Sequence, residues 1–225
     1  MTAARSQAEG KKPTVTARAS GVRVNARGRT SDNPTRERIL RVAGSLFLTN
    51  GYAATGIDQI SKQAGISPPT IYWHFQSKEA LLAEFLKATV TRLKDAVYPR
   101  VTADSPIDRL RQCVSAHVVF VLEWYAMHDA HQASSGFGPL FGALAPRHRK
   151  SIASTIDEYV NSIQRILDEG VRCGDFAISD ISITTMAIVS MADHVFTWFK
   201  PSGRATVEEV AARYAALAAD MVRAR

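Results

Sequence analysis

The sequence predicts an all-α protein, on three observations. From about residue 33 onward, apolar residues recur three and four positions apart, as they do on one face of a helix. Capping residues, Pro and Gly stand at the ends of these periodic segments. No alternating strand pattern, hairpin signal or internal repeat interrupts them. The length of 225 residues favours one or two domains.

The first four helices follow from their end signals. Pro34 fits the first turn of a helix that ends at Asn50-Gly51. Thr55 resembles the cap of a capping box that opens a short helix over 57–64, which Gly65 ends. Ser67 caps a third helix with Pro at its first position, and Ser77 caps a fourth that runs to about residue 97. These four segments predict a compact helical unit at the start of the folded chain.

Five more helical segments follow. The apolar spacing predicts helices over about 106–131, 147–173, 179–199 and 206–222, with a short one within 134–145. The last opens at a capping box, in which Thr206 is the cap and Glu209 is the reciprocal partner. Together these segments predict a second, larger helical domain.

The charge is concentrated at the N-terminus. Residues 1–30 hold seven basic residues and one acid, Glu9, so they carry +6 of the formal net charge of +7. Residues 1–32 also lack apolar periodicity, which predicts a disordered basic arm. The arm is either a solvated tail or a segment that contacts DNA phosphates or a minor groove.

Composition excludes several other classes. Two distant cysteines, Cys113 and Cys173, argue against a disulfide scaffold or a zinc module and favour a cytoplasmic protein. No secretory signal and no run of about 18 apolar residues is visible, so we expect no membrane partner. His128 and His131 are only two candidate metal ligands, and we predict no metal site.

The second and third helices, separated by a tight glycine turn, have the helix-turn-helix arrangement. The third helix would lie in the major groove of DNA, with its N-terminal residues at base edges. Ile71 and Phe75 face the core, which leaves Tyr72 and Trp73 for solvent or DNA. For Trp73, packing against the fourth helix is an equal alternative.

Three motifs carry a family resemblance: Gly65-Ile66-Ser67, Thr70-Ile71-Tyr72-Trp73-His74-Phe75 and Ser77-Lys78-Glu79-Ala80-Leu81-Leu82. With the stretch from Ile39 to Phe85 around them, they resemble the DNA-binding domain of the TetR family of transcriptional regulators. The remaining chain is similar to that family in length and helix order. The resemblance implies a helix-turn-helix DNA-binding domain over 33–76 and a ligand-binding and dimerisation domain over 77–225.

The resemblance also implies roles for single residues. Thr55 and Lys78 would meet phosphates, as would Tyr72 and His74, while Pro69 and Thr70 would approach bases. Pro68 departs from the family pattern, because many members carry a polar or basic residue at this position, and proline has no N–H to donate. The DNA-binding set is therefore Thr55, Ser67, Pro68, Pro69, Thr70, Tyr72, Trp73, His74 and Lys78.

The family usually dimerises through its last two long helices, here about 179–199 and 206–223. Four small residues on the first of them suit close approach of helices, with packing inside one chain as the alternative: Thr184, Ala187, Ser190 and Ala192. A homodimer would place two recognition helices on the half-sites of a palindromic operator.

Aromatic residues, Met and His gather in the second domain. The predicted ligand-binding residues are Trp124, Met127, His128, Phe137, Phe141, Met191, His194 and Trp198, with core packing as the alternative for each. His117 and His194 are expected as hydrogen-bonded core histidines. The run from Trp198 to Arg204 is similar to a branch of the family that responds to acyl-CoA thioesters. That similarity implies that CoA phosphates meet some of five basic residues, for which surface solvation is the alternative: Arg147, Arg149, Lys150, Lys200 and Arg204.

Three functions remain in competition. The first is a ligand-responsive repressor, with operator DNA, a second copy of the chain and a hydrophobic effector as partners, and no cofactor. The second is a non-specific architectural DNA-binding protein that depends on the basic arm. The third is an enzyme acting on a hydrophobic thioester, although no nucleophile elbow, phosphate loop or dinucleotide fingerprint is present, and we predict no enzymatic activity.

Overall fold

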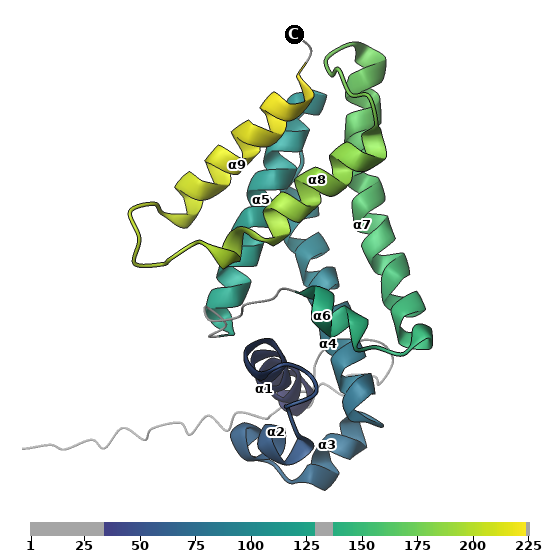
Figure 1. The fold of residues 1–225 in the computed structure, drawn as a ribbon, viewed down its shortest axis with the longest axis vertical. Coiled ribbons are helices and arrows are strands. Elements are labelled where there is room, and N and C mark those ends of the chain that lie inside the picture. The colour runs from purple at the N-terminus through teal and green to yellow at the C-terminus, as the bar shows by residue number, and fades with distance from the viewer. Residues whose placement is uncertain (1–33, 129–136, 224–225) are drawn as a thin grey trace, which may run out of the picture. The chain divides into compact units, whose positions relative to one another are not determined.

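The computed structural model describes residues 34–128 and 137–223, and the predicted basic arm over 1–32 lies outside the described residues. The described elements are α1 (Pro34–Asn50), α2 (Ile57–Ala64), α3 (Pro68–His74), α4 (Lys78–Val97), α5 (Pro106–Met127), α6 (Phe137–Gly142), α7 (Pro146–Cys173), α8 (Ile181–Asp193) and α9 (Val207–Val222) (Figure 1). A short 3₁₀ turn follows α4 at Tyr98–Arg100, and another follows α8 at Val195–Thr197. The described residues form no strand beyond one isolated bridge, so the all-α prediction is confirmed.

One glycine allows α1 and α4 to pack closely. A Cβ added at Gly44 in α1 would lie 2.2 Å from the Phe85 ring of α4, which is far inside van der Waals contact. The ring therefore occupies the space that any other side chain at residue 44 would need. This contact brings the helix-turn-helix unit against α4, which also packs on α5 and α7 of the larger helical body (Figure 1).

Most predicted caps are present, and one is wrong. Ser77 accepts a hydrogen bond from the backbone N–H of Ala80, and the capping box at Thr206 and Glu209 is complete. Gly56, not Thr55, is the N-cap of α2, and no side chain caps that helix. Thr55 is fully buried, so its side chain is drawn into the core rather than toward the helix end.

The predicted helix over 179–199 is shorter in the structure. Asp180 caps α8, which ends at Asp193, and His194 leaves the helical region at φ −98° and ψ 6°. The following turn buries Val195 and Phe196, and the Phe196 ring stacks on Tyr125 of α5 with centroids 3.8 Å apart. A continuous helix was therefore the wrong prediction, because burial of these two side chains against α5 favours a turn.

The larger body is built around α5. This helix packs against α4, α7, α8 and α9, and its buried face includes Leu110, Val118 and Val121 (Figure 1). Within residues 34–128 and 137–223, no helix is long and apolar enough to cross a membrane.

Candidate nucleic-acid interface and ligand cavity

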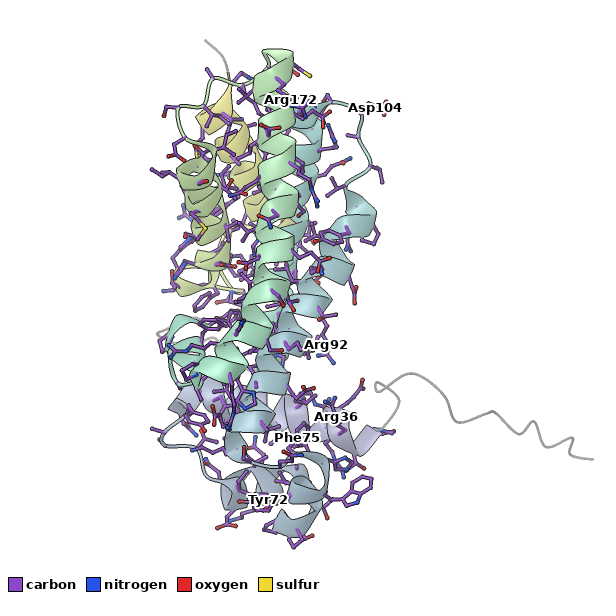
Figure 2. The ribbon with its side chains drawn as sticks, turned by 90° about the vertical axis from the view of Figure 1, so that its right-hand side faces the viewer. Arg36, Tyr72, Phe75, Arg92, Asp104 and Arg172 are labelled. Carbon is purple, nitrogen blue, oxygen red and sulfur yellow. The ribbon has the colours of Figure 1, made fainter. Side chains whose placement is uncertain are left out.

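Helix α3 has an inner and an outer face. Ile71 and the residue after the helix, Phe75, are 0% and 3% exposed, so they anchor the helix to the core. Tyr72 and Trp73 are 52% and 78% exposed, and Figure 2 shows Tyr72 on the side of α3 that points away from the rest of the molecule. The alternative in which Trp73 packs against α4 is therefore wrong, and both rings are available to a partner.

The turn before α3 and side chains of α1 and α4 hold α3 in position. Gly65 adopts the left-handed conformation at φ 63°, which gives the tight turn between α2 and α3. The Arg36 guanidinium lies over the Phe75 ring, 5.2 Å from its centroid, and pairs with Glu84 of α4 at 2.5 Å (Figure 2). Residues from α1 and α4 thus hold the end of α3 in place.

Small polar side chains surround the start of α3. The Ser67 and Thr70 hydroxyl oxygens lie 2.9 Å apart, and Ser67 makes no cap hydrogen bond to the helix. Pro69 is exposed, Pro68 is half-buried, and the half-buried His74 ring meets Trp73 edge-on at 4.6 Å. Seven of the nine predicted DNA-binding residues, 67–70 and 72–74, therefore belong to this one helix and its cap.

The other two predicted residues are engaged within the molecule. Thr55 donates its hydroxyl hydrogen toward the carbonyl oxygens of Leu46 and Gly51, at 3.1 and 2.8 Å. The Lys78 ammonium donates to the carbonyl oxygens of Tyr52 and Thr55, at 2.8 and 2.9 Å. In this conformation the Thr55 hydroxyl binds carbonyl groups of α1 and of the loop before α2, and Lys78 binds that loop, so their contacts with phosphates stay a prediction.

A cavity of about 270 Å³ lies in the larger body. Residues from α4, α5, α6, α7 and α8 line it, and most of them are aliphatic or aromatic, including Leu86, Leu93, Phe120, Phe141, Ile156 and Val160. Its size and apolar wall are typical of a site for a small hydrophobic molecule.

The predicted ligand-binding residues only partly coincide with this cavity. Phe137 and Phe141 line it. Trp124 and His128 stack on each other at 4.0 Å inside the core, without being part of the cavity wall. The remaining four lie outside the wall, and they are exposed apart from the half-buried Met191: Met127, Met191, His194 and Trp198.

The cavity contains a polar cluster that the sequence analysis missed. His117 Nε2 lies 2.9 Å from Asp193 Oδ1, and His117 Nδ1 lies 3.0 Å from the Tyr159 hydroxyl oxygen. Burial is the largest of the causes that raise the pKa of Tyr159 well above its ordinary value, so this phenol keeps its proton. Burial also raises the pKa of Cys113, 4.0 Å from that hydroxyl, to about 11.

His117 is the buried, hydrogen-bonded histidine that the sequence predicted, whereas His194 is exposed. The two hydrogen-bond partners of His117 lie 42 and 76 residues further along the chain, so sequence spacing gave no signal of the cluster. In the part of the chain that the structure describes, no group of three or more His, Cys, Asp or Glu side chains is arranged to hold a metal ion.

One contact joins the cavity wall to the helix-turn-helix unit. The backbone N–H of Ala145, just after α6, donates to Glu79 Oε1 at 2.7 Å, and Arg147 pairs with the same carboxylate at 3.5 Å. Glu79 lies in the first turn of α4, next to Lys78, which binds the loop before α2. Helix α6 also contacts α1 and α4 directly (Figure 1).

A helix-turn-helix unit with an exposed recognition helix, joined to a helical body with an apolar cavity, defines a ligand-responsive DNA-binding regulator. Two family models match the chain: "Bacterial regulatory proteins, tetR family" over residues 39–85 and "Tetracyclin repressor-like, C-terminal domain" over residues 103–222. The chain therefore belongs to the TetR family of transcriptional regulators.

Individual relatives agree with this assignment. The repressor KstR2 of Rhodococcus jostii (strain RHA1) is 26% identical over 82% of this chain and 89% of its own length. A crystal structure of a tetR-family regulator from Rhodococcus RHA1 superposes with a TM-score of 0.76, at 27% identity, over 86% of this chain and 99% of that one. The regulator AibR, in complex with isovaleryl coenzyme A and operator DNA, has the same fold at a TM-score of 0.72 and 22% identity, over 81% of this chain and 97% of that chain.

Proposed function

We propose that this protein is a cytoplasmic, non-enzymatic repressor that binds a palindromic operator as a homodimer and releases it when a small hydrophobic ligand fills the cavity. The observation that carries the proposal is the bond between Glu79 and Ala145. It links the segment after α6 to α4, and both helices line the cavity while α4 holds the helix-turn-helix unit. Repression is the function named for KstR2, the relative that aligns over most of the chain.

The outer face of α3 would supply the DNA contacts. Tyr72, Trp73 and Thr70 offer aromatic edges and hydroxyls, and the Ser67 hydroxyl lies beside them. Pro68 has no N–H, so base discrimination would depend on these side chains and on apolar contact with thymine methyl groups. Phosphate contacts would supply most of the affinity, and base contacts would supply the sequence preference.

A second copy of the chain would bind to the exposed apolar face of α8 and α9. Ile183 and Met186 on α8 are 69% and 51% exposed, and Leu217 and Met221 on α9 are 52% and 48% exposed. Of the small residues predicted to allow close approach, Ala187 and Ser190 lie on this side, whereas Ala192 is buried within the chain. Burial of these side chains would stabilise the dimer and fix the spacing of the two recognition helices.

The ligand would act through a difference in affinity between two conformations. A molecule in the cavity contacts α6, and α6 is joined to α4 through Glu79. A conformation of α4 and α6 that binds the ligand better and spaces the recognition helices wrongly would lower operator affinity. The loss of operator affinity can be no larger than the difference in ligand affinity between the two conformations.

We propose acyl-CoA thioesters as the first class of effector to test. AibR, which shares the fold, was crystallised with isovaleryl coenzyme A. The five basic residues considered for the CoA phosphates are all exposed, so they are available to an anion: Arg147, Arg149, Lys150, Lys200 and Arg204. The acyl group would occupy the apolar cavity.

Fluorescence anisotropy at physiological salt tests the proposal, with duplexes that flank the protein's own gene and scrambled controls. We expect a preference of about a thousandfold or more for one flanking duplex, and release of that duplex by an acyl-CoA. Equal binding to both duplexes, lost when residues 1–32 are deleted, would instead support the architectural alternative. Turnover of a thioester would contradict the non-enzymatic assignment.

A further inference from the structure

The polar groups of the cavity gather where α5, α7 and α8 meet. A carboxylate oxygen only accepts hydrogen bonds, so His117 Nε2 carries the hydrogen that it donates to Asp193 across 2.9 Å. In the neutral imidazole ring Nδ1 is then an acceptor, and Tyr159 donates its hydrogen to it across 3.0 Å. The lone pairs of Tyr159 and the second carboxylate oxygen of Asp193 remain as acceptors for a bound molecule.

The cavity has no cation to receive an anionic ligand. None of the described residues that line it is Lys or Arg, and Asp193 is the acidic residue among them. The Asp193 side chain is 43% exposed and remains partly hydrated, and a carboxylate placed beside it would face a like charge, which opposes binding. The lining therefore favours an uncharged molecule over an acid.

The buried Tyr125 hydroxyl also lacks a hydrogen-bond partner in the part of the chain that the structure describes, but Tyr125 is not among the residues that line the cavity. A ligand hydroxyl suits the cluster of His117, Tyr159 and Asp193, because it donates to a carboxylate.

We infer that the cavity selects an uncharged hydrocarbon body carrying one hydroxyl group, which Asp193, His117 and Tyr159 recognise, and that it rejects carboxylates. The inference rests on the proposed function, because it concerns the ligand of the same cavity. It differs from the proposed acyl-CoA class, because the carbonyl of a thioester has no hydrogen to donate to the cluster. The hydroxyl donates to the acceptors of the cluster, while the carbon skeleton lies against the phenylalanine and aliphatic walls.

Isothermal titration calorimetry of the full chain with three eight-carbon probes tests this selectivity. The probes are 1-octanol, which donates and accepts, 2-octanone, which only accepts, and octanoate, which is anionic. We expect 1-octanol to bind about tenfold or more tightly than 2-octanone, the effect of one hydrogen bond to a charged group, and octanoate to bind weakest.

Two variants test which side chains produce the preference for 1-octanol over 2-octanone. Asp193→Asn and Tyr159→Phe preserve side-chain shape, and we expect both to reduce the preference for 1-octanol over 2-octanone to within about threefold. Tyr98→Phe is the matched control, because Tyr98 stacks on Tyr159 with centroids 6.4 Å apart and is not among the residues that line the cavity. This control should keep the full preference.

Four results would overturn the inference: octanoate binding as tightly as 1-octanol, 2-octanone matching 1-octanol, an unchanged preference in both variants, or no binding of any probe. Operator anisotropy with the same probes separates this inference from the proposed function. Binding of 1-octanol without operator release contradicts the proposed release mechanism and leaves the ligand inference standing. Release of the operator by octanoate in preference to 1-octanol contradicts the ligand inference and supports the proposed function.

Discussion

The DNA-binding helix and the cavity differ in how their functional residues are arranged along the chain. The outer face of α3 and its cap come from seven positions in one short stretch, 67–70 and 72–74, with side chains that reach solvent. The polar cluster of the cavity joins His117, Tyr159 and Asp193 from three helices, and its contacts exist only after packing. A contiguous surface can be recognised in a sequence, and its residues can be substituted without loss of the fold. A packed cluster cannot be recognised in this way, and substitutions within it disturb the packing.

The largest expected effect is on the exposed face of α3. The double variant Tyr72→Ala and Trp73→Ala should weaken operator binding about a hundredfold or more, since each direct DNA contact contributes about 1–3 kcal/mol. Its melting temperature should stay close to that of the wild type, because both side chains are more than half exposed. Anisotropy and thermal unfolding measure the two quantities.

Val171→Ala, an exposed residue of α7, is the control and should change neither quantity. A large drop in melting temperature in the double variant would show that Tyr72 and Trp73 support the fold. The outer face of α3 would then contribute to stability as a packed region does, and the proposed difference between the two regions would be wrong.

The next largest effect is on stability, at the contact between α1 and α4. Gly44→Ala places a Cβ into the Phe85 ring, and such overpacking costs about 1–3 kcal/mol. Urea unfolding should show this loss, and Phe85→Leu in the same chain should recover part of it by removing the ring. Gly142→Ala, at the end of α6, has open space around its Cβ and serves as the control. Equal stability of the Gly44 and Gly142 variants would mean that the close approach is not required.

The sequence predicted the fold and the helix-turn-helix surface well because both depend on local signals. Helix periodicity and caps such as Ser77 act within a few residues, and the inner face of α3, with Ile71 and Phe75, follows from a single helical turn. The family resemblance covered the same contiguous stretch. These features can be predicted without knowing which helices pack together.

The sequence was least informative where a residue had two possible partners. Thr55 and Lys78 suit a phosphate chemically, and in the structure both bind carbonyl groups of the α1–α2 region. The aromatic residues predicted to bind a ligand were equally ambiguous. Trp124 packs in the core and Trp198 binds Tyr214, whereas Phe137 and Phe141 of α6 line the cavity. Long-range packing decides between such partners, and a single sequence does not encode it visibly.

Two aromatic residues of the larger body, one in the cavity wall and one outside it, test whether only the cavity wall contributes to ligand binding. Phe141→Ala removes part of the cavity wall and should weaken 1-octanol binding about tenfold, because a buried aromatic contact contributes about 1.5–3 kcal/mol. Trp198→Ala should leave that affinity within about twofold, since this ring is exposed and its N–H donates to Tyr214 at 2.9 Å. Calorimetry compares the two variants. Equal losses in both would mean that the bound ligand extends beyond the cavity to Trp198.

The smallest expected effect is on the connection between the two regions. Glu79→Ala removes the acceptor for the Ala145 N–H, so a ligand in the cavity should influence α4 less. The ligand concentration that releases half of the operator should rise several-fold, within the range of about 0.5–2 kcal/mol for residues that modulate coupling. Operator affinity without ligand, and ligand affinity without DNA, should change little.

Arg147→Met separates the two contacts of Glu79. The Arg147 side chain is 74% exposed, so its ion pair with Glu79 contributes little, and this variant should behave like the wild type. If Arg147→Met weakens release as much as Glu79→Ala does, the charge of the pair and not the backbone hydrogen bond couples the cavity to α4. If neither variant changes release while both ligand and operator still bind, the two regions communicate through the direct packing of α6 on α1 and α4, and Glu79 only stabilises the turn after α6.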